Sequence, residues 1–167
     1  RDRVRYAFQT QMFFLLSRYR QQQQIVARIA REPLISDYMF AKDWLFARLN
    51  LTGDEWDVYQ QIHAALAEQI IPPDLVVYLK ASTDTLMGRI AQRDRPYERD
   101  MDRNYIEALR QAYDRYFADY RDTALLTIDT NDLAGEDKID QATWSEIIWY
   151  QPLVVRLGPS TQTVPLE

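Results

Sequence analysis

The 167-residue chain has the length of one ordinary domain, and its formal net charge of −5 disfavours a general nucleic-acid-binding surface. Hydrophobic residues make up 47% of the chain, which is enough for a folded core, and no apolar run reaches the roughly 18 residues of a membrane span. The absence of cysteine excludes disulfide bonds and thiolate metal sites and fits a cytoplasmic protein, and the single histidine, His63, excludes a histidine-rich metal centre.

The first half of the chain predicts helices around one short strand. Apolar residues recur at helical spacing from residue 4 to about residue 30 with no Gly or Pro between them, so we expect a long helix there. Glu32-Pro33 ends this helix, and the short apolar run at 34–38 predicts a buried strand. Further helices are expected over 44–49 and, after the turn at Thr52-Gly53-Asp54, over 54–71.

The second half alternates strand and helix patterns. Residues 75–79, LVVYL, form a continuous apolar run that is typical of a strand buried on both faces of a parallel sheet. The elements expected after it are a capped helix at 83–92, a helix at 102–121, a second buried strand at 124–129 and a helix at 138–149. This alternation predicts a helix-rich, three-layer α/β fold with a parallel sheet and right-handed crossovers. We expect one domain over residues 1–150 and an extended or loosely packed tail over 151–167.

The bend RIAQRDRPYERD, residues 89–100, gathers Arg89, Arg93, Arg95 and Arg99 in an acidic chain. One interpretation is a solvated helix end, where arginine interacts with the helix dipole by about 0.3–1 kcal/mol. The other is a phosphate clamp, because the guanidinium fork matches phosphate geometry and stays charged. Arg89 and Arg93 are spaced i, i+4 and share one helix face. Spacing alone leaves both interpretations open.

The segment PDLVVYLKASTDTLMGRIAQRDRPYERDMDRNYIEALRQAYDRYF, residues 73–117, resembles the deoxyribonucleoside kinases, and the resemblance runs from about residue 6 to residue 132. It implies a P-loop kinase-like fold and ATP- and Mg²⁺-dependent 5′-phosphorylation of deoxyribonucleosides in nucleotide salvage, with purines preferred. Residues 89–100 would then form a lid. Arg89, Arg93 and Arg95 would be lid arginines at the ATP phosphates, and Glu98 would bind the 3′-hydroxyl of the sugar.

The stretch FQTQMFFLLSRYR, residues 8–20, carries the second point of resemblance. In the family a helix here holds a glutamine and an arginine that read the base, which implies Arg18 together with Gln11 or Gln9. We prefer Gln11, because positions i and i+7 share a helix face. Asp43 takes the place of the base-reading acid, which needs a partner if it is buried, and Arg18 is that expected partner if both line the base pocket. A core helix with surface glutamines is the alternative.

The third point is ISDYMFAKDWLFA, residues 35–47, where Asp37 takes the place of the family's strand-end acid. The motif's arginine and serine are replaced here by Tyr38 and Met39. Asp37 is expected at the catalytic centre as a Mg²⁺ ligand, although a strand-end acid also caps turns. Asn131 and Asp132 would lie beside the adenine of ATP, although this is also ordinary turn chemistry.

The four glycines of the sequence do not form a G-x-x-x-x-G-K-[ST] phosphate loop. We therefore expect that loop and the general base to lie upstream of Arg1, and we expect these 167 residues alone to be inactive. A homodimer through the helices at 4–30 and 54–71 is a further expectation. Two other functions stay open: a nucleoside monophosphate kinase of the thymidylate type, and a noncatalytic nucleotide-binding or dimerisation module.

Overall fold

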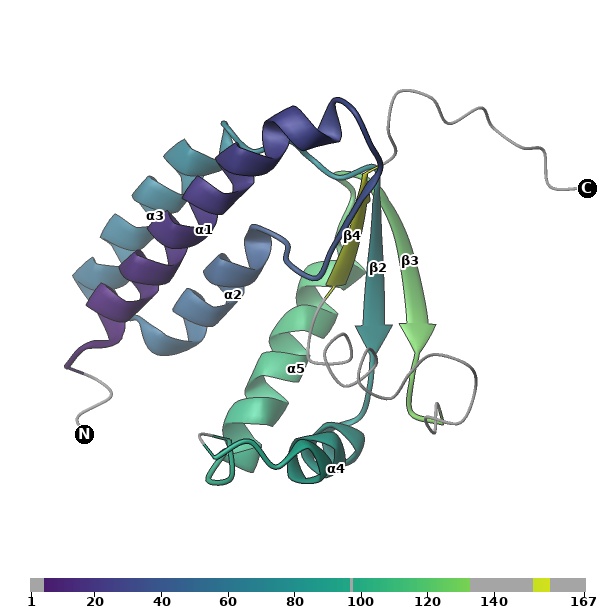
Figure 1. The fold of residues 1–167 in the computed structure, drawn as a ribbon. Helices are drawn as coiled ribbons and strands as arrows, with labels where there is room; N and C mark the ends of the chain where they lie inside the picture. The colour runs from purple at the N-terminus through teal and green to yellow at the C-terminus, as the bar shows by residue number, and fades with distance from the viewer. Residues whose placement is uncertain (1–4, 97, 133–151, 157–167) are drawn as a thin grey trace, which may run out of the picture.

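The computed structural model of the protein describes residues 5–96, 98–132 and 152–156 (Figure 1). Its helices and strands are, in chain order, α1 (Ala7–Ile29), β1 (Leu34–Ser36), α2 (Ala41–Asn50), α3 (Gly53–Ala67), β2 (Leu75–Lys80), α4 (Thr83–Arg93), α5 (Arg103–Ala118), β3 (Ala124–Asp129) and β4 (Pro152–Arg156). No helix in the described part of the chain is both long and apolar enough to cross a membrane.

The sheet has the strand order β1-β4-β2-β3. Strands β2 and β3 pair in parallel, from Leu75 opposite Ala124 to Lys80 opposite Asp129, as the sequence predicts. Strand β4 pairs antiparallel with both β1 and β2, so β1 and β2 run in the same direction. The three predicted strands are confirmed in position, but the expectation that the first and third are buried was wrong, since Ile35 and Leu126 are exposed. The fourth, β4, was not predicted and lies in the tail that we expected to be extended or loosely packed.

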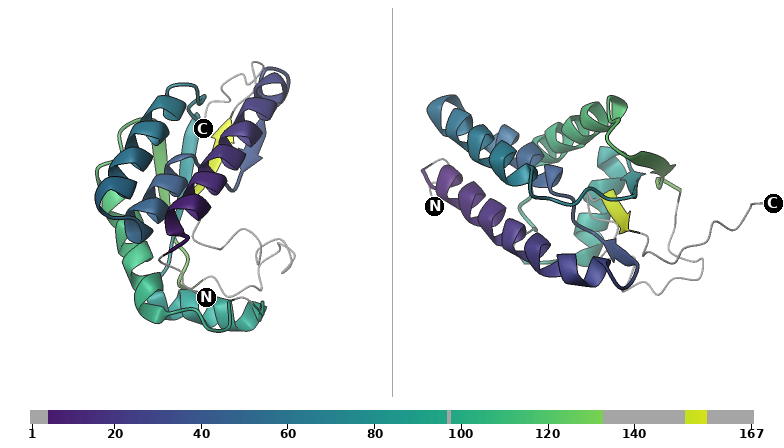
Figure 2. Two further views of the ribbon diagram at one scale, coloured as in Figure 1. Left: turned by 90° about the vertical axis from the view of Figure 1, so that its left-hand side faces the viewer. Right: turned by 90° about the horizontal axis from the view of Figure 1, so that it is seen from above.

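Helices α5 and α2 pack on one face of the sheet. Val76 and Tyr78 of β2 belong to a core cluster with Leu109, Tyr113 and Phe117 of α5, and the rings of Tyr78 and Phe117 stack with centroids 4.5 Å apart. Figures 1 and 2 show α1 and α3 as an outer pair, with α2 between them and α5. The described residues therefore build one core on the sheet, a second among α1, α2 and α3, and a smaller third between α4 and α5.

The opposite face of the sheet is more open. Because side chains alternate along a strand and the paired strands are in register, Ile35 and Leu126 lie on the face opposite Val76. They are 68% and 48% exposed. The helix expected over 138–149 lies outside the described residues.

Helix α3 ends at Ala67, before the predicted end at residue 71. After it, the amides of Gln69 and Ile70 donate to carbonyls three residues back, which makes a tight turn. Pro72 and Pro73 follow this turn. Because proline disfavours the helical conformation of the residue before it, the helix stops early.

Tyr59 offers a test of the second core, which also contains Leu15, Phe40, Ala47 and Leu51. Its side chain is 0% exposed, and its hydroxyl has no hydrogen-bond partner in the described part of the chain. Since an unsatisfied buried polar group costs about 1–3 kcal/mol, Tyr59→Phe is expected to raise the free energy of unfolding by about that amount. Tyr59→Ala is expected to lower it by about 3–5 kcal/mol, because it leaves a cavity.

Denaturant unfolding of the full-length protein and the two variants measures both effects. A Tyr59→Phe variant that is clearly less stable than the unmodified protein would show that the hydroxyl is satisfied and useful.

Candidate active site

A cavity of about 180 Å³, here called the α1–α2 pocket, lies between these two helices. Helix α1 contributes Gln11, Phe14 and Arg18, at positions i, i+3 and i+7 of one face. The chain after β1 and helix α2 contribute Tyr38, Lys42, Asp43 and Phe46. The structure thus brings together the three residues proposed to read a base, Gln11, Arg18 and Asp43. Gln11 lines the pocket and Gln9 does not, in agreement with the choice made from helical spacing.

Asp43 is buried, with 9% of its surface exposed, and the Tyr38 hydroxyl donates to its Oδ2. Burial raises the pKa of Asp43, while the hydrogen bond from Tyr38 and the charge of Arg18 act in the opposite direction. Burial likewise raises the pKa of Tyr38, so the phenol is a proton donor at neutral pH. Tyr38 therefore supplies the contact that favours the ionised form of Asp43 against the effect of burial.

The expected direct pairing of Arg18 with Asp43 was wrong. The ion pairs of the described residues include none between them within 4.0 Å. The Arg18 guanidinium instead lies 5.0 Å from the centre of the Tyr38 ring and donates to Gln21 at 3.1 Å. The physical reason is that Tyr38 contacts both groups, since its ring meets the guanidinium and its hydroxyl donates to the carboxylate.

Lys42 also lines the α1–α2 pocket, and sequence reasoning missed it. Its ammonium lies 5.8 Å from the centre of the Phe46 ring, one helical turn further along α2. Burial lowers the pKa of Lys42 to about 8, although the charge of Asp37 acts against this. The signal in the sequence was the i, i+4 spacing of Lys42 and Phe46 beside Asp43.

The arginine-rich bend holds a buried ion pair. Arg93 donates to Glu98 through Nη2 at 2.6 Å from Oε1 and through Nε at 3.2 Å from Oε2, and the two side chains are 11% and 7% exposed. Asp94, in the left-handed conformation with φ 47°, ends α4 and turns the chain so that Glu98 folds back onto Arg93. Arg99 pairs with Asp94 at the exposed surface. Because Arg93 and Glu98 are buried, the bend is not the uniformly solvent-exposed helix end of the first interpretation.

Arg89 points to the loop after β3. Its Nη1 donates to Thr130 Oγ1 at 3.1 Å, its Nη2 donates to the Thr130 carbonyl, and burial lowers its pKa. Asn131 Oδ1 accepts from the Ser82 amide and the Thr85 hydroxyl, both at 2.8 Å, and so caps the start of α4. The expected contact of Asn131 and Asp132 with ATP stays a prediction.

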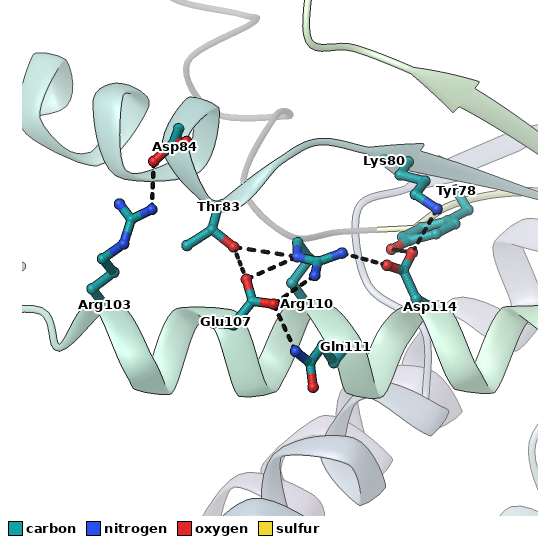
Figure 3. Close-up of polar contacts among 9 residues, drawn as sticks. All are labelled: Tyr78, Lys80, Thr83, Asp84, Arg103, Glu107, Arg110, Gln111 and Asp114. Atoms are coloured by element: carbon teal, nitrogen blue, oxygen red, sulfur yellow. Dashed lines mark hydrogen bonds and ion pairs between the residues drawn. The ribbon is translucent and has the colours of Figure 1, made fainter.

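A polar network joins α4, α5 and β2 near the carboxyl end of the sheet (Figure 3). Arg110 donates to Glu107 Oε1 and to Asp114 Oδ2, each at 2.6 Å. The Thr83 hydroxyl donates to Glu107, and Tyr78 donates to Asp114 Oδ1 at 3.0 Å. Sequence reasoning missed this network, although its α5 members Glu107, Arg110 and Asp114 are spaced i, i+3 and i+7 on one helix face. It fixes the start of α4, the helix that carries Arg89 and Arg93.

Glu107 makes this network sensitive to acid. Hydrogen bonds from Arg110, then Thr83 and Gln111, lower the pKa of Glu107 from 4.5 to about 2. A carboxylate whose pKa is lower in the folded state stabilises the fold above its unfolded pKa. We therefore expect this contribution to be complete above pH 4.5 and to be lost as the pH falls toward 2.

Thermal unfolding of full-length Glu107→Gln and unmodified protein at several pH values between 2 and 6 checks this expectation. The difference in stability between them should shrink as the pH falls. Glu68→Gln, at the exposed end of α3, is the control variant. An unchanged difference across the range would contradict the expectation.

The sequence model of the family described as "Deoxynucleoside kinase" matches residues 1–147. The chain belongs to the deoxynucleoside kinase family. It is 33% identical over 111 residues to the deoxyguanosine kinase of Bacillus subtilis. This alignment covers 65% of this chain and 54% of that protein. It is 32% identical over 124 residues to the deoxyadenosine kinase of Dictyostelium discoideum, with coverage of 71% and 50%. The chain thus spans about half the length of these deoxynucleoside kinases.

The solved structures agree on the fold. The deoxyadenosine kinase from M. mycoides with bound dCTP superimposes with a TM-score of 0.66 at 23% sequence identity, over 88% of this chain and 73% of that one. The predicted kinase-like α/β fold class is confirmed by this similarity. The resemblance stated from the motifs at residues 8–20, 35–47 and 73–117 is likewise confirmed at the level of the family.

Proposed function

We propose that the whole protein transfers the γ-phosphoryl group of ATP to the 5′-hydroxyl of a deoxyribonucleoside, with a purine preferred, as a step of nucleotide salvage. The observation that carries this proposal is the family match over residues 1–147, which includes both the α1–α2 pocket and the arginine-rich bend. Because the chain spans about half of its relatives, the activity belongs to the full-length protein.

The α1–α2 pocket suits a nucleobase. Phe14 and Phe46 supply apolar ring surface, and polar groups of Gln11, Arg18 and Asp43 line the same cavity. Such a mixture of ring surface and a few polar groups is typical of small-molecule sites. In the proposed complex these three polar side chains bind the base, and Glu98 accepts a hydrogen bond from the sugar 3′-hydroxyl.

Arg89, Arg93 and Arg95 are proposed to bind the phosphates. Phosphoryl transfer needs little covalent chemistry from the protein, which mainly positions the groups and neutralises charge on the transferring oxygens. Guanidinium groups do this because they stay charged and offer two parallel donors. The buried Arg93–Glu98 pair supports this role, since it would couple the sugar-binding acid to a phosphate-binding arginine.

Asp37 is proposed as the Mg²⁺ ligand. The described residues include no group of three or more His, Cys, Asp or Glu that forms a metal site by itself. Asp37 lies exposed just after β1, and Mg²⁺ bound with nucleotide phosphates needs only one or two protein carboxylates. One carboxylate there fits that chemistry. The ion would polarise the phosphates when bound, and Asp37 would hold it in place.

We also propose a cytoplasmic homodimer. Helix α1 exposes Phe13 and Leu16, and helix α3 exposes Val58, which supports an interface through the helices at 4–30 and 54–71. Sedimentation equilibrium of the full-length protein measures the oligomeric state, and a monomer at micromolar concentration would exclude this interface.

A coupled assay of ATP consumption tests the proposed activity. The full-length protein, with any segment that precedes Arg1, is assayed with Mg²⁺, ATP and each of the four deoxyribonucleosides. Turnover of one or two of them is the expected result. Absence of turnover with all four, together with turnover of a nucleoside monophosphate, would show that the acceptor is a nucleotide instead.

A further inference from the structure

Lys42 differs from an ordinary surface lysine. It lies in the first turn of α2, is half-buried and lines the α1–α2 pocket. The charged groups that act on its ammonium are Asp37 after β1, Arg18 on α1 and Asp43 on α2. Within the described residues its ammonium makes no ion pair within 4.0 Å. A cation is thus held at the pocket with its donors available to a ligand.

The other polar groups of the pocket are partly occupied. Tyr38 donates to Oδ2 of Asp43, so that oxygen is taken and Oδ1 stays available as an acceptor. Arg18 lies over the Tyr38 ring and donates to Gln21. Lysine has three donors and no acceptor. Lys42 and Asp43 therefore present a donor and an acceptor to the same cavity.

This pair of groups distinguishes the purines. The edge of guanine offers the O6 acceptor next to the N1–H donor, and N7 is a further acceptor beside O6. The edge of adenine has the opposite order, because its 6-amino group donates and its N1 accepts. An ammonium that meets O6 makes a hydrogen bond, whereas one that meets the 6-amino group leaves two donors facing each other. Thymine offers O4 as an acceptor but has a methyl group where guanine has N7.

We propose that Lys42 is a specificity-determining residue that donates to the 6-oxo group of a purine and makes the pocket prefer deoxyguanosine to deoxyadenosine. This inference rests on the proposed function, since it assigns the base to the same pocket. Phe46 keeps the lysine stem in place through its ring contact with the ammonium. Half-burial increases the effect, because a hydrogen bond to a charged group is stronger where water is excluded.

The test compares deoxyguanosine, deoxyinosine and deoxyadenosine as substrates of the full-length protein and its Lys42→Met variant. Deoxyinosine keeps O6, N1–H and N7 but lacks the 2-amino group, so it isolates the proposed contact. The unmodified protein is expected to prefer both 6-oxopurines. In Lys42→Met the ratio of kcat/KM for deoxyinosine to that for deoxyadenosine should fall by about 10- to 100-fold.

Two further variants separate this role from a structural one. Lys42→Arg keeps the donors and should retain most of the preference. Lys80→Met removes a lysine that pairs with Asp114 at 3.2 Å, away from the α1–α2 pocket, and should leave the ratio unchanged. An equal fall of kcat/KM for all three nucleosides in Lys42→Met, or no fall for any, would overturn the proposal.

Failure of the proposed function is distinguishable from failure of this inference. If the unmodified full-length protein phosphorylates no nucleoside, calorimetry measures the binding of deoxyinosine and deoxyadenosine to the same variants. A preference for deoxyinosine that disappears in Lys42→Met supports the role of Lys42 without turnover. Equal affinities in the unmodified protein overturn it.

Discussion

Replacing Arg93 with methionine is expected to lower kcat/KM of the full-length protein by about 10³-fold, the lower end of the effect of an arginine that stabilises a transferring phosphoryl group. Arg93 is nearly buried and donates three hydrogen bonds to Glu98. A guanidinium oriented in this way needs little reorganisation to meet phosphate oxygens. Methionine keeps much of the apolar stem, so the substitution removes mainly the charge and the donors.

Arg99→Met is the matched control, because Arg99 belongs to the same bend and also pairs with an acid. Its partner Asp94 is exposed, and exposed ion pairs contribute about 0–1 kcal/mol. We expect Arg99→Met to change kcat/KM by no more than about threefold. Steady-state kinetics with thermal unfolding of both variants checks this. Equal losses in the two variants would mean that the bend acts only through its overall charge.

Periodicity and apolar runs predicted the helices of the described residues and the positions of three strands, because α1, α5, β2 and β3 have strong local patterns. They missed β4. Its residues 152–156 form a strand by pairing with β1 and β2. Strand β1 lies more than a hundred residues earlier in the chain, and β2 lies about seventy residues earlier. Such a strand depends on distant partners, and strand propensity is set largely by context.

The grouping of the candidate residues was predictable where one helix determines it. Gln11 and Arg18 share a face of α1, and spacing alone places them together. The contacts of Asp43 were not predictable in this way, because they depend on how α2 packs against α1 and on Tyr38, which departs from the family motif. Lys42 was missed for the same reason. The Arg93–Glu98 pair depends on the left-handed conformation of Asp94, which sequence reasoning did not consider.

Tyr38→Phe is expected to raise the KM for the deoxyribonucleoside by about tenfold and to lower the free energy of unfolding by about 1–3 kcal/mol. The substitution removes the hydroxyl that donates to Asp43 and leaves a buried carboxylate oxygen without that bond. The KM for ATP should not change, because the lost contact lies in the α1–α2 pocket.

The effect should also depend on pH. The hydrogen bond from Tyr38 is the largest influence that lowers the pKa of Asp43, against the effect of burial. Removing this bond raises the pKa further, so the carboxylate of the variant is protonated at a higher pH than that of the unmodified protein. A protonated Asp43 loses its charge as an acceptor for the base. The KM of Tyr38→Phe should therefore begin to rise at a higher pH than that of the unmodified protein as the pH is lowered.

A double-mutant cycle with Asp43→Asn identifies the contact responsible. If the Tyr38 hydroxyl acts through the Asp43 carboxylate, Tyr38→Phe costs less in the Asp43→Asn background than in the unmodified protein. Tyr6→Phe, at the exposed start of α1, controls for loss of a phenol elsewhere. Additive effects of the two substitutions would contradict this coupling. Tyr38 would then act on the pocket through its ring, which holds Arg18 in place.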